Sequence, residues 1–490
     1  MNKWVRWLLG LDHPVQQLDE NELAALVERH YRWNFAVNLV EGSAFFLGLG
    51  FLSSSTIVPL FISKLTASTW PIGLAAVLGQ AGWFLPQLVS ANWIERLPRR
   101  KPVAANLGLL LEQLPTWLLV IPAFVANRWA GLALGLFLAI LAWRNLGGGL
   151  VAPAWQDMIA RVIPVRRRGL FWGSTAAIGT LLGTAAAALA AWLLASFPFA
   201  LNFAAIFALA AFVFTMGWFF MTTTREPPHP VHGPRQSQRE FLASLPGLLR
   251  EDAPFRRFLL AYGLLGLGGM GLGFVTVSAV RRFGVSDSTV GLYTGALLVG
   301  EGLGSLVFGV LADRHGHKFA LEWSAGLFSV AFALAWLAPR ASWYYAAFFS
   351  LGMALGTRLN SGLLVVWEFC EPPRRPTYIG VASTVMGLVS IVGPLAGAWL
   401  AKSNYSLLFA LSAAINLAAL GALRRWVREP RWSVPASLHS AAVGETTPAS
   451  VPSDVAEGTT PASLLPATPV GCETNPARGT EGRSYWERNH

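Results

Sequence analysis

The sequence is poor in charged residues. Asp, Glu, Lys and Arg make up 13% of its 490 residues, and 54% are hydrophobic. A soluble globular protein carries about a quarter charged residues, so this shortage excludes an ordinary soluble fold. The 21 Trp and 30 Phe residues fit a chain whose rings contact lipid and its interfaces. We therefore predict an all-α integral membrane protein.

Several kinds of site are missing as well. Two cysteines, Cys370 and Cys472, are too few for a disulfide framework and lack metal-ligand spacing. No G-x-x-x-x-G-K-[ST] loop is present, which argues against an ATP-driven pump. The His residues are scattered through loops and tails, so we predict no enzyme, no catalytic residues, no cofactor and no metal.

Long apolar runs dominate what is there. A helix needs about 20 mainly apolar residues to cross about 30 Å of hydrocarbon. The sequence predicts twelve such spans in two groups of six, near 34–60, 72–94, 103–123, 129–152, 169–195, 200–223, 257–280, 289–312, 319–338, 343–367, 378–401 and 405–426.

Basic residues set the expected orientation. The net charge of +11 comes from Lys and Arg clustered in alternate short loops, which indicates membrane topology and not nucleic-acid binding. Both termini and the central loop should be cytoplasmic, in the cytoplasmic membrane of a bacterium. The expected parts are an amphipathic N-terminal segment, a six-helix bundle, a central loop, a second bundle and a disordered tail, at 1–33, 34–223, 224–256, 257–427 and 428–490.

The two halves resemble each other. Glu95 and Asp313 occupy equivalent loops, and Arg144 and Arg358 occupy equivalent spans, each followed four residues later by a glycine. Weak repetition of this kind is typical of transporter folds whose halves rock about a central site. We expect two pseudo-repeat bundles.

One charged loop interrupts each half. "GVLADRHGHKFAL" spans Gly309–Leu321, and a degraded copy, "WIERLPRRKPVAA", spans Trp93–Ala105. An acid and several bases between two helix ends can complement the helix dipoles, so these latch loops could hold one conformation; an ordinary basic loop is the alternative. Their residues are Glu95, Arg96, Arg99, Gly309, Asp313, Arg314, Gly316 and Lys318.

The loop at Gly309 resembles the signature G-x-L-a-D-r-x-G-r-[RK] of the major facilitator superfamily. The resemblance in span number, half-repeat and loop position covers about residues 34–427, and it implies a transporter with two six-helix bundles. In that family the stronger copy is usually in the first half, whereas here that copy has Glu95 for the acid and Pro98 for the glycine.

A second family pattern, l-x-x-x-R-x-x-q-G, is similar to Ile140, Arg144 and Gly148 in the fourth span. The family's antiporter signature in the fifth span is poorly matched, and a G-P step occurs in the eleventh span instead. The resemblance therefore does not support antiport.

Small residues inside the spans predict close helix contacts. The glycine-rich stretch "GLLGLGGMGLG" at 263–273 mimics a nucleotide loop but lies within a span, so it indicates close packing or a flexible break. The positions expected to pack helices are Gly148, Gly183, Gly362, Gly393 and Pro394.

Ionisable residues inside spans are the candidate transport site, because a charge in hydrocarbon costs at least about 2.5–3.5 kcal/mol. Separation of Arg144 from Glu112 or Glu41 during rocking would load or release a proton, unless the pairs are permanent and structural. Asn34, Asn38 and Glu41 share one helix face that should line a cavity. The predicted pathway residues are Asn38, Glu41, Gln80, Glu112, Arg144, Glu301 and Arg358.

Together these features favour a secondary transporter that works as a monomer on a small molecule, coupled to H⁺ or driven by the solute gradient. The many Trp and Phe residues favour export of amphiphilic or drug-like compounds. Import of a nutrient such as a sugar or organic acid is the alternative, and a non-transporting sensor or scaffold belongs to a different class.

Overall fold

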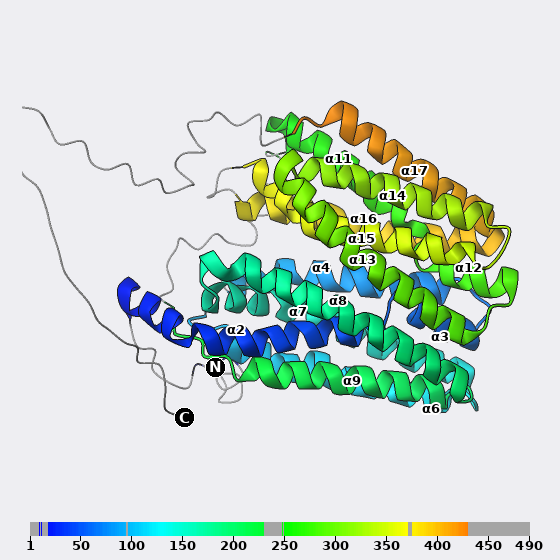
Figure 1. Cartoon of the computed structure of the whole chain (residues 1–490), viewed down its shortest axis with the longest axis horizontal. Coiled ribbons are helices and arrows are strands. Elements are labelled where there is room, and N and C mark those ends of the chain that lie inside the picture. The colour runs from blue at the N-terminus through cyan, green and yellow to red at the C-terminus, as the bar shows by residue number, and fades with distance from the viewer. Residues whose placement is uncertain are drawn as a thin grey trace, which may run out of the picture. The chain divides into compact units, whose positions relative to one another are not determined.

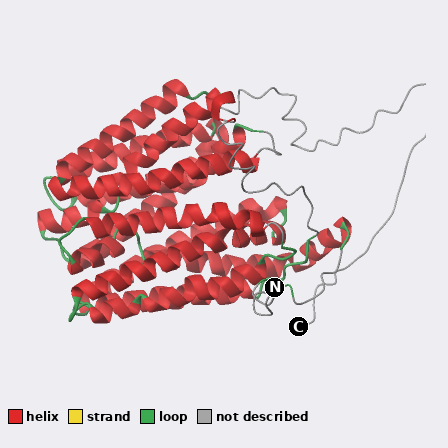
Figure 2. Ribbon diagram, turned by 180° about the vertical axis from the view of Figure 1, so that it is seen from behind, coloured by secondary structure: helices red, strands yellow, loops and turns green. Residues whose placement is uncertain are grey.

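The computed structural model describes residues 9, 11, 18–94, 97–229, 247, 249–370 and 375–429, and every regular element in these ranges is a helix (Figures 1 and 2). The helices of the first half are α2 (Glu20–Phe51), α3 (Ile57–Leu65), α4 (Trp70–Ile94), η1 (Val103–Leu107), η2 (Leu109–Gln113), α5 (Leu114–Leu118), α6 (Val120–Val125), α7 (Ala130–Val162), α8 (Val165–Ser196) and α9 (Leu201–Thr222). Those of the second half are α11 (Ala253–Gly268), η3 (Gly269–Gly271), α12 (Phe274–Phe283), α13 (Asp287–His315), α14 (His317–Leu337), α15 (Trp343–Glu368), α16 (Arg375–Ser403) and α17 (Tyr405–Trp426).

The helices are long and apolar enough to span a membrane. Within the described ranges, 11 helical stretches meet this criterion, and α4 adds a further helix of 25 residues. Large apolar side chains such as Leu181 and Trp399 are 73% and 62% exposed, as expected for surfaces that contact lipid and not water. The predicted all-α fold with twelve spans is confirmed.

The first span differs from its predicted form. Asp19 and Glu22 form a capping box, and α2 then continues without a break for 32 residues. From Glu20 on, the N-terminal segment expected at 1–33 is therefore continuous with the first spanning helix. At the other end α2 stops at Phe51, and a short turn leads into α3.

Two other spans are irregular. The third span begins with the π-helical turns η1 and η2, and Glu112 lies in η2. The seventh span is broken by the 3₁₀ turn η3, where Gly269 and Gly271 flank Met270. The glycine-rich stretch thus produces a break, one of the two outcomes expected of it. Such irregular turns occur often at functional sites.

Helix packing follows the same scheme in both halves. In the first half α2 packs on α8 and α9, while α4 packs on α7; in the second half α11 packs on α16 and α17, while α13 packs on α15. Across the halves α8 packs on α13 and α4 packs on α16, and each contact is the counterpart of the other. Helix α3 also contacts α12 and α13, and α2 contacts α13. This correspondence is what duplication of one six-helix unit produces.

The interface between α13 and α15 is the tightest glycine contact in the second half. Gly300 and Gly304 lie against the backbone of Phe349 and Met353, while Gly352 and Gly356 lie against the backbone of Leu297 and Glu301. Each helix thus presents a G-x-x-x-G pair to the other. Without side chains at these positions, the two backbones approach closely, as is common where membrane helices pack.

The predicted domain boundaries stay predictions. The parts of the central loop at 230–246 and the tail from 430 onward, including the segment expected to be disordered, lie outside the described residues.

Candidate functional site

A cavity of about 410 Å³ lies between the two halves, lined mainly by residues of the first. Helices α2, α4, α7, α8 and α9, together with η2, supply most of its wall. The second half supplies the broken part of the seventh span around η3, and Pro394 of α16. The irregular turns of both halves therefore border the same space.

The cavity has three ionisable residues in its lining, Glu41, Glu112 and Arg144. Arg144 donates from Nε to the Thr116 hydroxyl at 2.9 Å, and its guanidinium lies 4.9 Å from the centre of the Phe214 ring. Glu112 is the carboxylate that interacts electrostatically with Arg144. Among the described residues, however, no ion pair within 4.0 Å joins Arg144 to Glu112.

Four polar atoms in the cavity wall are buried and form no hydrogen bond in the structure. They are Glu41 Oε2, Gln113 Oε1, Trp155 Nε1 and Thr175 Oγ1. A buried polar group without a partner costs about 1–3 kcal/mol. Four such groups around one cavity indicate a place where a solute or water completes the hydrogen bonds.

Aromatic rings form much of the remaining wall. Trp83, Trp155, Trp172 and Trp218 all line the cavity. Trp155 and Trp172 meet edge to face with their ring centres 5.9 Å apart. Thr175 lies one turn beyond Trp172 on α8 and packs against Gly42, the neighbour of Glu41. One end of the cavity therefore combines a carboxylate with large aromatic rings.

Polar contacts join the two halves at the end of the spans opposite the charged loops. Lys64 and Asp287 form an ion pair at 2.7 Å, and the Thr56 and Thr294 hydroxyls lie 2.7 Å apart. Thr69 donates to the Ala398 carbonyl at 2.8 Å. These contacts connect the halves on one side of the cavity.

The pathway residues predicted for the first half are only partly assembled there. Glu41, Gln80, Glu112 and Arg144 line the cavity. Asn38 does not: it is fully buried and its amide donates to Thr224 Oγ1 at 3.0 Å. On the predicted polar face of α2, only Glu41 reaches the cavity. Asn34 and Asn38 instead form hydrogen bonds to Arg225 and Thr224, which directly follow α9, because an Asn can satisfy its hydrogen bonds in a helix contact as well as in water.

The structure does not bring Glu301 and Arg358 together. Arg358 borders a separate cavity of about 20 Å³ beside Gln80, and its guanidinium lies 5.6 Å from the centre of the Phe328 ring. Glu301 lies in α13, where its backbone contacts Gly352 and Gly356 of α15. Neither of these two predicted pathway residues lines the main cavity.

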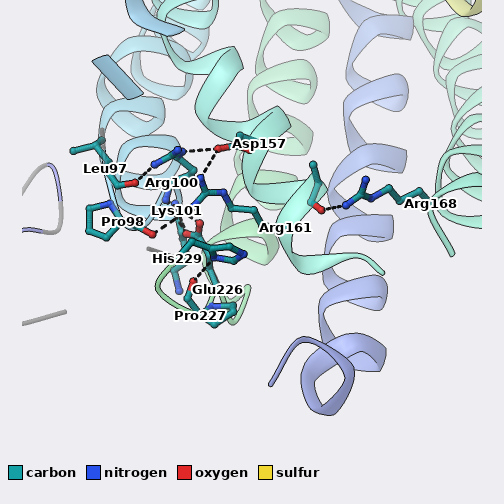
Figure 3. Close-up of polar contacts among 11 residues, drawn as sticks. Leu97, Pro98, Arg100, Lys101, Asp157, Arg161, Arg168, Glu226, Pro227 and His229 are labelled. Carbon is teal, nitrogen blue, oxygen red and sulfur yellow. Dashed lines mark hydrogen bonds and ion pairs between the residues drawn. The ribbon is translucent and has the colours of Figure 1, made fainter. Parts of the chain in front are cut away.

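A network of charges surrounds the first latch loop (Figure 3). Arg100 is 2% exposed, and its Nε donates to Asp157 Oδ2 at 2.6 Å. Arg161 binds the same carboxylate at 3.0 Å. Glu226 accepts hydrogen bonds from the backbone N–H groups of Arg100 at 2.9 Å and Lys101 at 2.7 Å. The carboxylate of Glu226 thus caps the start of the third span, where unpaired N–H groups favour an anion.

Burial changes the proton affinity of this network. Burial raises the pKa of the Glu226 carboxyl, although the Arg100 and Lys101 amides oppose the change. Burial also lowers the pKa of His229, and the nearby positive charge of Arg161 adds to this. The backbone N–H of His229 donates to the Pro98 carbonyl at 3.0 Å and holds the residue in place. Neutral imidazole is therefore the favoured form at this position.

The second half has a related arrangement at the equivalent place. Lys318 pairs with Glu322 at 2.8 Å, and Arg424 pairs with the same carboxylate at 3.3 Å. Gly316, with φ of 94°, lies against the Glu429 carboxyl group. A residue with a Cβ atom would be strained at that φ and would collide with Glu429.

The other predicted latch residues are placed as follows. Gly309 and Asp313 lie within α13, and Arg314 is exposed near its end. Arg99 is partly buried next to Arg100. Glu95 and Arg96 lie outside the described residues. The loop at Gly309–Leu321 is thus mostly helix, and Gly316 is its turn.

The predicted packing positions differ in how closely they approach a neighbour. A Cβ atom at Gly148 would lie 2.7 Å from Glu112 Oε1, and one at Gly183 would lie 3.1 Å from the Phe46 carbonyl oxygen. Gly362 contacts the Tyr262 hydroxyl. Gly393 has only an ordinary contact at 3.9 Å, with Leu267, while its neighbour Pro394 borders the cavity.

The sequence reasoning missed Glu226 and Glu429. A signal was present, since the tripeptide Arg-Glu-Pro occurs at residues 225–227 and again at residues 428–430, just after the last span of each half. It also missed the cavity residues Trp155 and Thr175, which no local pattern distinguishes from other span residues.

Comparison with protein families gives one match. The model described as Major Facilitator Superfamily matches residues 258–464, which begin in α11 and include the rest of the second half.

Two curated proteins are similar over shorter segments. A niacin transporter, NiaP, of Acinetobacter baylyi is 26% identical over 155 residues, which are 30% of this chain and 35% of that protein. An uncharacterised MFS-type transporter, YfkF, of Bacillus subtilis is 25% identical over 172 residues, which are 33% of this chain and 44% of that protein. The matched segments therefore span less than half the length of either relative.

Solved structures share the fold over most of the chain. A mutant of the nucleoside transporter NupG has a TM-score of 0.60 at 13% identity and covers 80% of this chain and 100% of its own. A D-xylose–proton symporter has a TM-score of 0.60 at 16% identity, with 82% and 99% covered. A bacterial homologue of the iron transporter ferroportin in the inward-facing state has a TM-score of 0.56 at 16% identity, with 81% and 98% covered. At these identities the likeness concerns the fold, while the family match supports the predicted resemblance to the major facilitator superfamily over residues 258–464.

Proposed function

We propose that the protein is a secondary active transporter that moves a small solute across the cytoplasmic membrane by alternating access. The observation that carries this proposal is the cavity between the two halves, with four buried polar atoms left unpaired in its wall. A site that is only structural would satisfy these atoms internally. The match of residues 258–464 to the Major Facilitator Superfamily model supports the same function.

The orientation in this proposal follows the basic loops. Both termini and the latch loops are cytoplasmic, so Lys64–Asp287 and the neighbouring contacts close the extracytoplasmic side. The state described here is then one in which solute exchanges with the cytoplasm. Rocking of the bundles would break these contacts and form others at the latch loops.

Proton coupling is the second part of the proposal, and it rests on Glu41, Glu112 and Arg144. Arg144 is held by Thr116 and lies in the field of Glu112 without forming an ion pair within 4.0 Å. A guanidinium in this position can approach or leave the carboxylate with a small movement. Approach favours the ionised carboxylate, and departure favours its protonated form.

Export of amphiphilic or drug-like compounds fits the wall of the cavity, in which four Trp and four Phe residues line the space. Import of a nutrient is the second candidate. Its support is the naming of similar proteins as transporters of niacin, nucleosides and D-xylose.

A flux measurement tests the proposal. The purified protein would be reconstituted in proteoliposomes and assayed for uptake and efflux over a panel of amphiphiles, sugars and organic acids, with and without an imposed pH gradient. We expect flux of at least one solute to respond to the gradient, and E112Q to abolish that response. The matched control is E28Q near the start of α2, where the exposed carboxylate pairs with Arg166 away from the cavity.

Three results would each count against one part of the proposal. If no solute moves faster than in empty vesicles, transport fails. If flux occurs but neither the gradient nor E112Q changes it, transport stands and proton coupling fails. Retained flux in D313N would remove the latch role of the second loop.

A further inference from the structure

We propose that the cavity binds a monovalent organic cation with an aromatic body, and that Glu41 is the carboxylate that binds its positive charge. This deepens the proposed function, since it names the solute class for the same cavity. The argument rests on the charges of the cavity, on which of them are already paired, and on the rings around the one that is not.

The charges of the lining do not cancel. Two carboxylates, Glu41 and Glu112, face one guanidinium, that of Arg144, and no Lys, Asp or His lines the cavity. With all three groups ionised, the cavity carries one net negative charge. A buried charge is stable only when an opposite charge or several hydrogen bonds compensate it.

Arg144 is already committed. Its Nε binds the Thr116 hydroxyl, its Nη1 lies 3.5 Å from Asn145 Oδ1, and its face rests on the Phe214 ring. Its charge is compensated by Glu112, with which it interacts electrostatically. An anionic solute would have to compete with Glu112 for this guanidinium.

Glu41 has no cation beside it, and the polar group that interacts with its carboxylate is the Trp155 indole. Its electrostatic neighbour among charged residues is Glu112, which repels it. Its Oε2 atom is buried and accepts no hydrogen bond, and Thr175 Oγ1, at the neighbouring turn of α8, is unpaired as well. The missing element at this point of the cavity is a positive charge.

The rings near Glu41 suit an organic cation better than a metal ion. The Trp155 indole interacts with Glu41, and Trp172 meets Trp155 edge to face. The faces of Trp rings attract ammonium groups, and this is how proteins recognise quaternary ammonium ligands. A metal ion would need several oxygen or nitrogen ligands, and no cluster of three His, Cys, Asp or Glu side chains suited to a metal occurs in the described part of the chain.

Size and shape complete the match. A volume of about 410 Å³ lies within the range of about 300–1,000 Å³ found for small-molecule sites. Trp83 and Trp218 line the same cavity, as does Phe214. An ammonium group near Glu41 would leave room for an aromatic body against these rings.

Equilibrium binding to the detergent-purified full chain tests the inference. Calorimetry would compare three probes with the same phenylalkyl body: phenylbutyltrimethylammonium, phenylpentanoate and phenylpentanol. We expect the cation to bind at least about tenfold more tightly than the anion or the alcohol. E41Q should lower the affinity for the cation by about tenfold or more, and E41D should keep the preference for the cation. E28Q, which removes a carboxylate from the exposed part of the same helix, should leave all three affinities within about twofold.

Three outcomes overturn the inference: no binding of the cation to folded wild-type protein, equal or tighter binding of the anion or alcohol, or unchanged cation affinity in E41Q. If E41Q does not fold, the comparison of the three probes on the wild type and E41D decides. Flux in proteoliposomes is read separately. If the cation binds in a manner that depends on Glu41 but no solute is transported, the transport proposal fails and the cation-site inference stands. If other solutes are transported but the protein shows no preference for the cation, the transport proposal stands and the cation-site inference fails.

Discussion

The two bundles share a packing scheme but not a chemistry. α2, α8 and α9 in the first half pack as α11, α16 and α17 do in the second. The ionisable groups of the main cavity nevertheless all come from the first half, and the second half supplies a glycine-broken span. Duplication therefore fixes which helices touch, because backbone contacts tolerate few alternatives. The side chains that face the cavity are free to differ.

The largest effect should come from breaking the scaffold of the second bundle. G352L would drive a side chain into the Leu297 backbone on α13, and we expect a loss of stability of about 3 kcal/mol or more. The measurement is the yield of monodisperse protein and its thermal unfolding in detergent. G326L on α14 is the matched control, since nothing lies within 4 Å of a Cβ atom there. Equal tolerance of both changes would show that the glycine contact does not hold this bundle together.

The second comparison concerns Arg144 and Arg358, which occupy equivalent spans of the two halves. R144A removes the guanidinium that compensates Glu112, so we expect transport of an active solute to fall by at least about tenfold, which corresponds to about 1.4 kcal/mol. R358A removes a guanidinium that rests on Phe328 beside a much smaller cavity, and its rate should fall less than about threefold. Initial rates in proteoliposomes at matched protein density measure both. A larger loss in R358A would move the active centre to the second half.

A third comparison sets the two charge networks side by side. R100A leaves Asp157 without its closest cation and opens a buried space, and we expect unfolding to become easier by about 3 kcal/mol. K318A leaves Glu322 paired with Arg424, so the cost should be about 1 kcal/mol or less. Unfolding in mixed SDS micelles gives both values. Similar losses would mean that the second network is as tightly built as the first.

The smallest effect concerns pH. The folded pKa of His229 lies below its ordinary value of 6.5 because the ring is partly buried near Arg161. The unfolded chain then binds a proton at this site more readily, so the stability from His229 is present above about pH 6.5 and is lost as pH falls toward the folded pKa.

H229Q removes this titration. The midpoint temperature of thermal unfolding in detergent is measured between about pH 8 and about pH 5. As the pH is lowered, this temperature should fall less steeply in H229Q than in the wild type. The position that follows the second Arg-Glu-Pro at the same spacing is Trp432, which does not titrate. Parallel curves for wild type and H229Q would remove the proposed neutral histidine.

Much of the fold could be predicted from the sequence. The span near 405–426 coincides with α17, because Asn404 caps its start and the apolar run is uninterrupted. The first span could not be delimited in the same way, since a capped amphipathic segment and the apolar run form one helix. Hydropathy marks where a chain enters lipid and does not mark where a helix begins.

The site was partly predictable for a related reason. Ionisable residues within spans can be selected from the sequence, and Glu112 and Arg144 line one cavity, while their part in transport stays a prediction. The direction in which a side chain points depends on the neighbouring helices, which is why Asn38 binds Thr224 and Glu301 does not meet Arg358. Glu226 was missed because a carboxylate after a span looks solvated until the chain folds back onto a helix end.

The unbroken course of α2 has a mechanical consequence. Because one helix joins Glu20 to Phe51, and in Figure 1 it reaches past its neighbours at the end where it begins, its outer part must follow any tilt of the first bundle. Asn21 lies about 30 Å along the axis from Glu41 at 1.5 Å per residue, so a tilt of about 10° would swing it by about 5 Å. A spin label or fluorophore on this protruding part of α2 would thus report tilting of the first bundle around the distant Glu41.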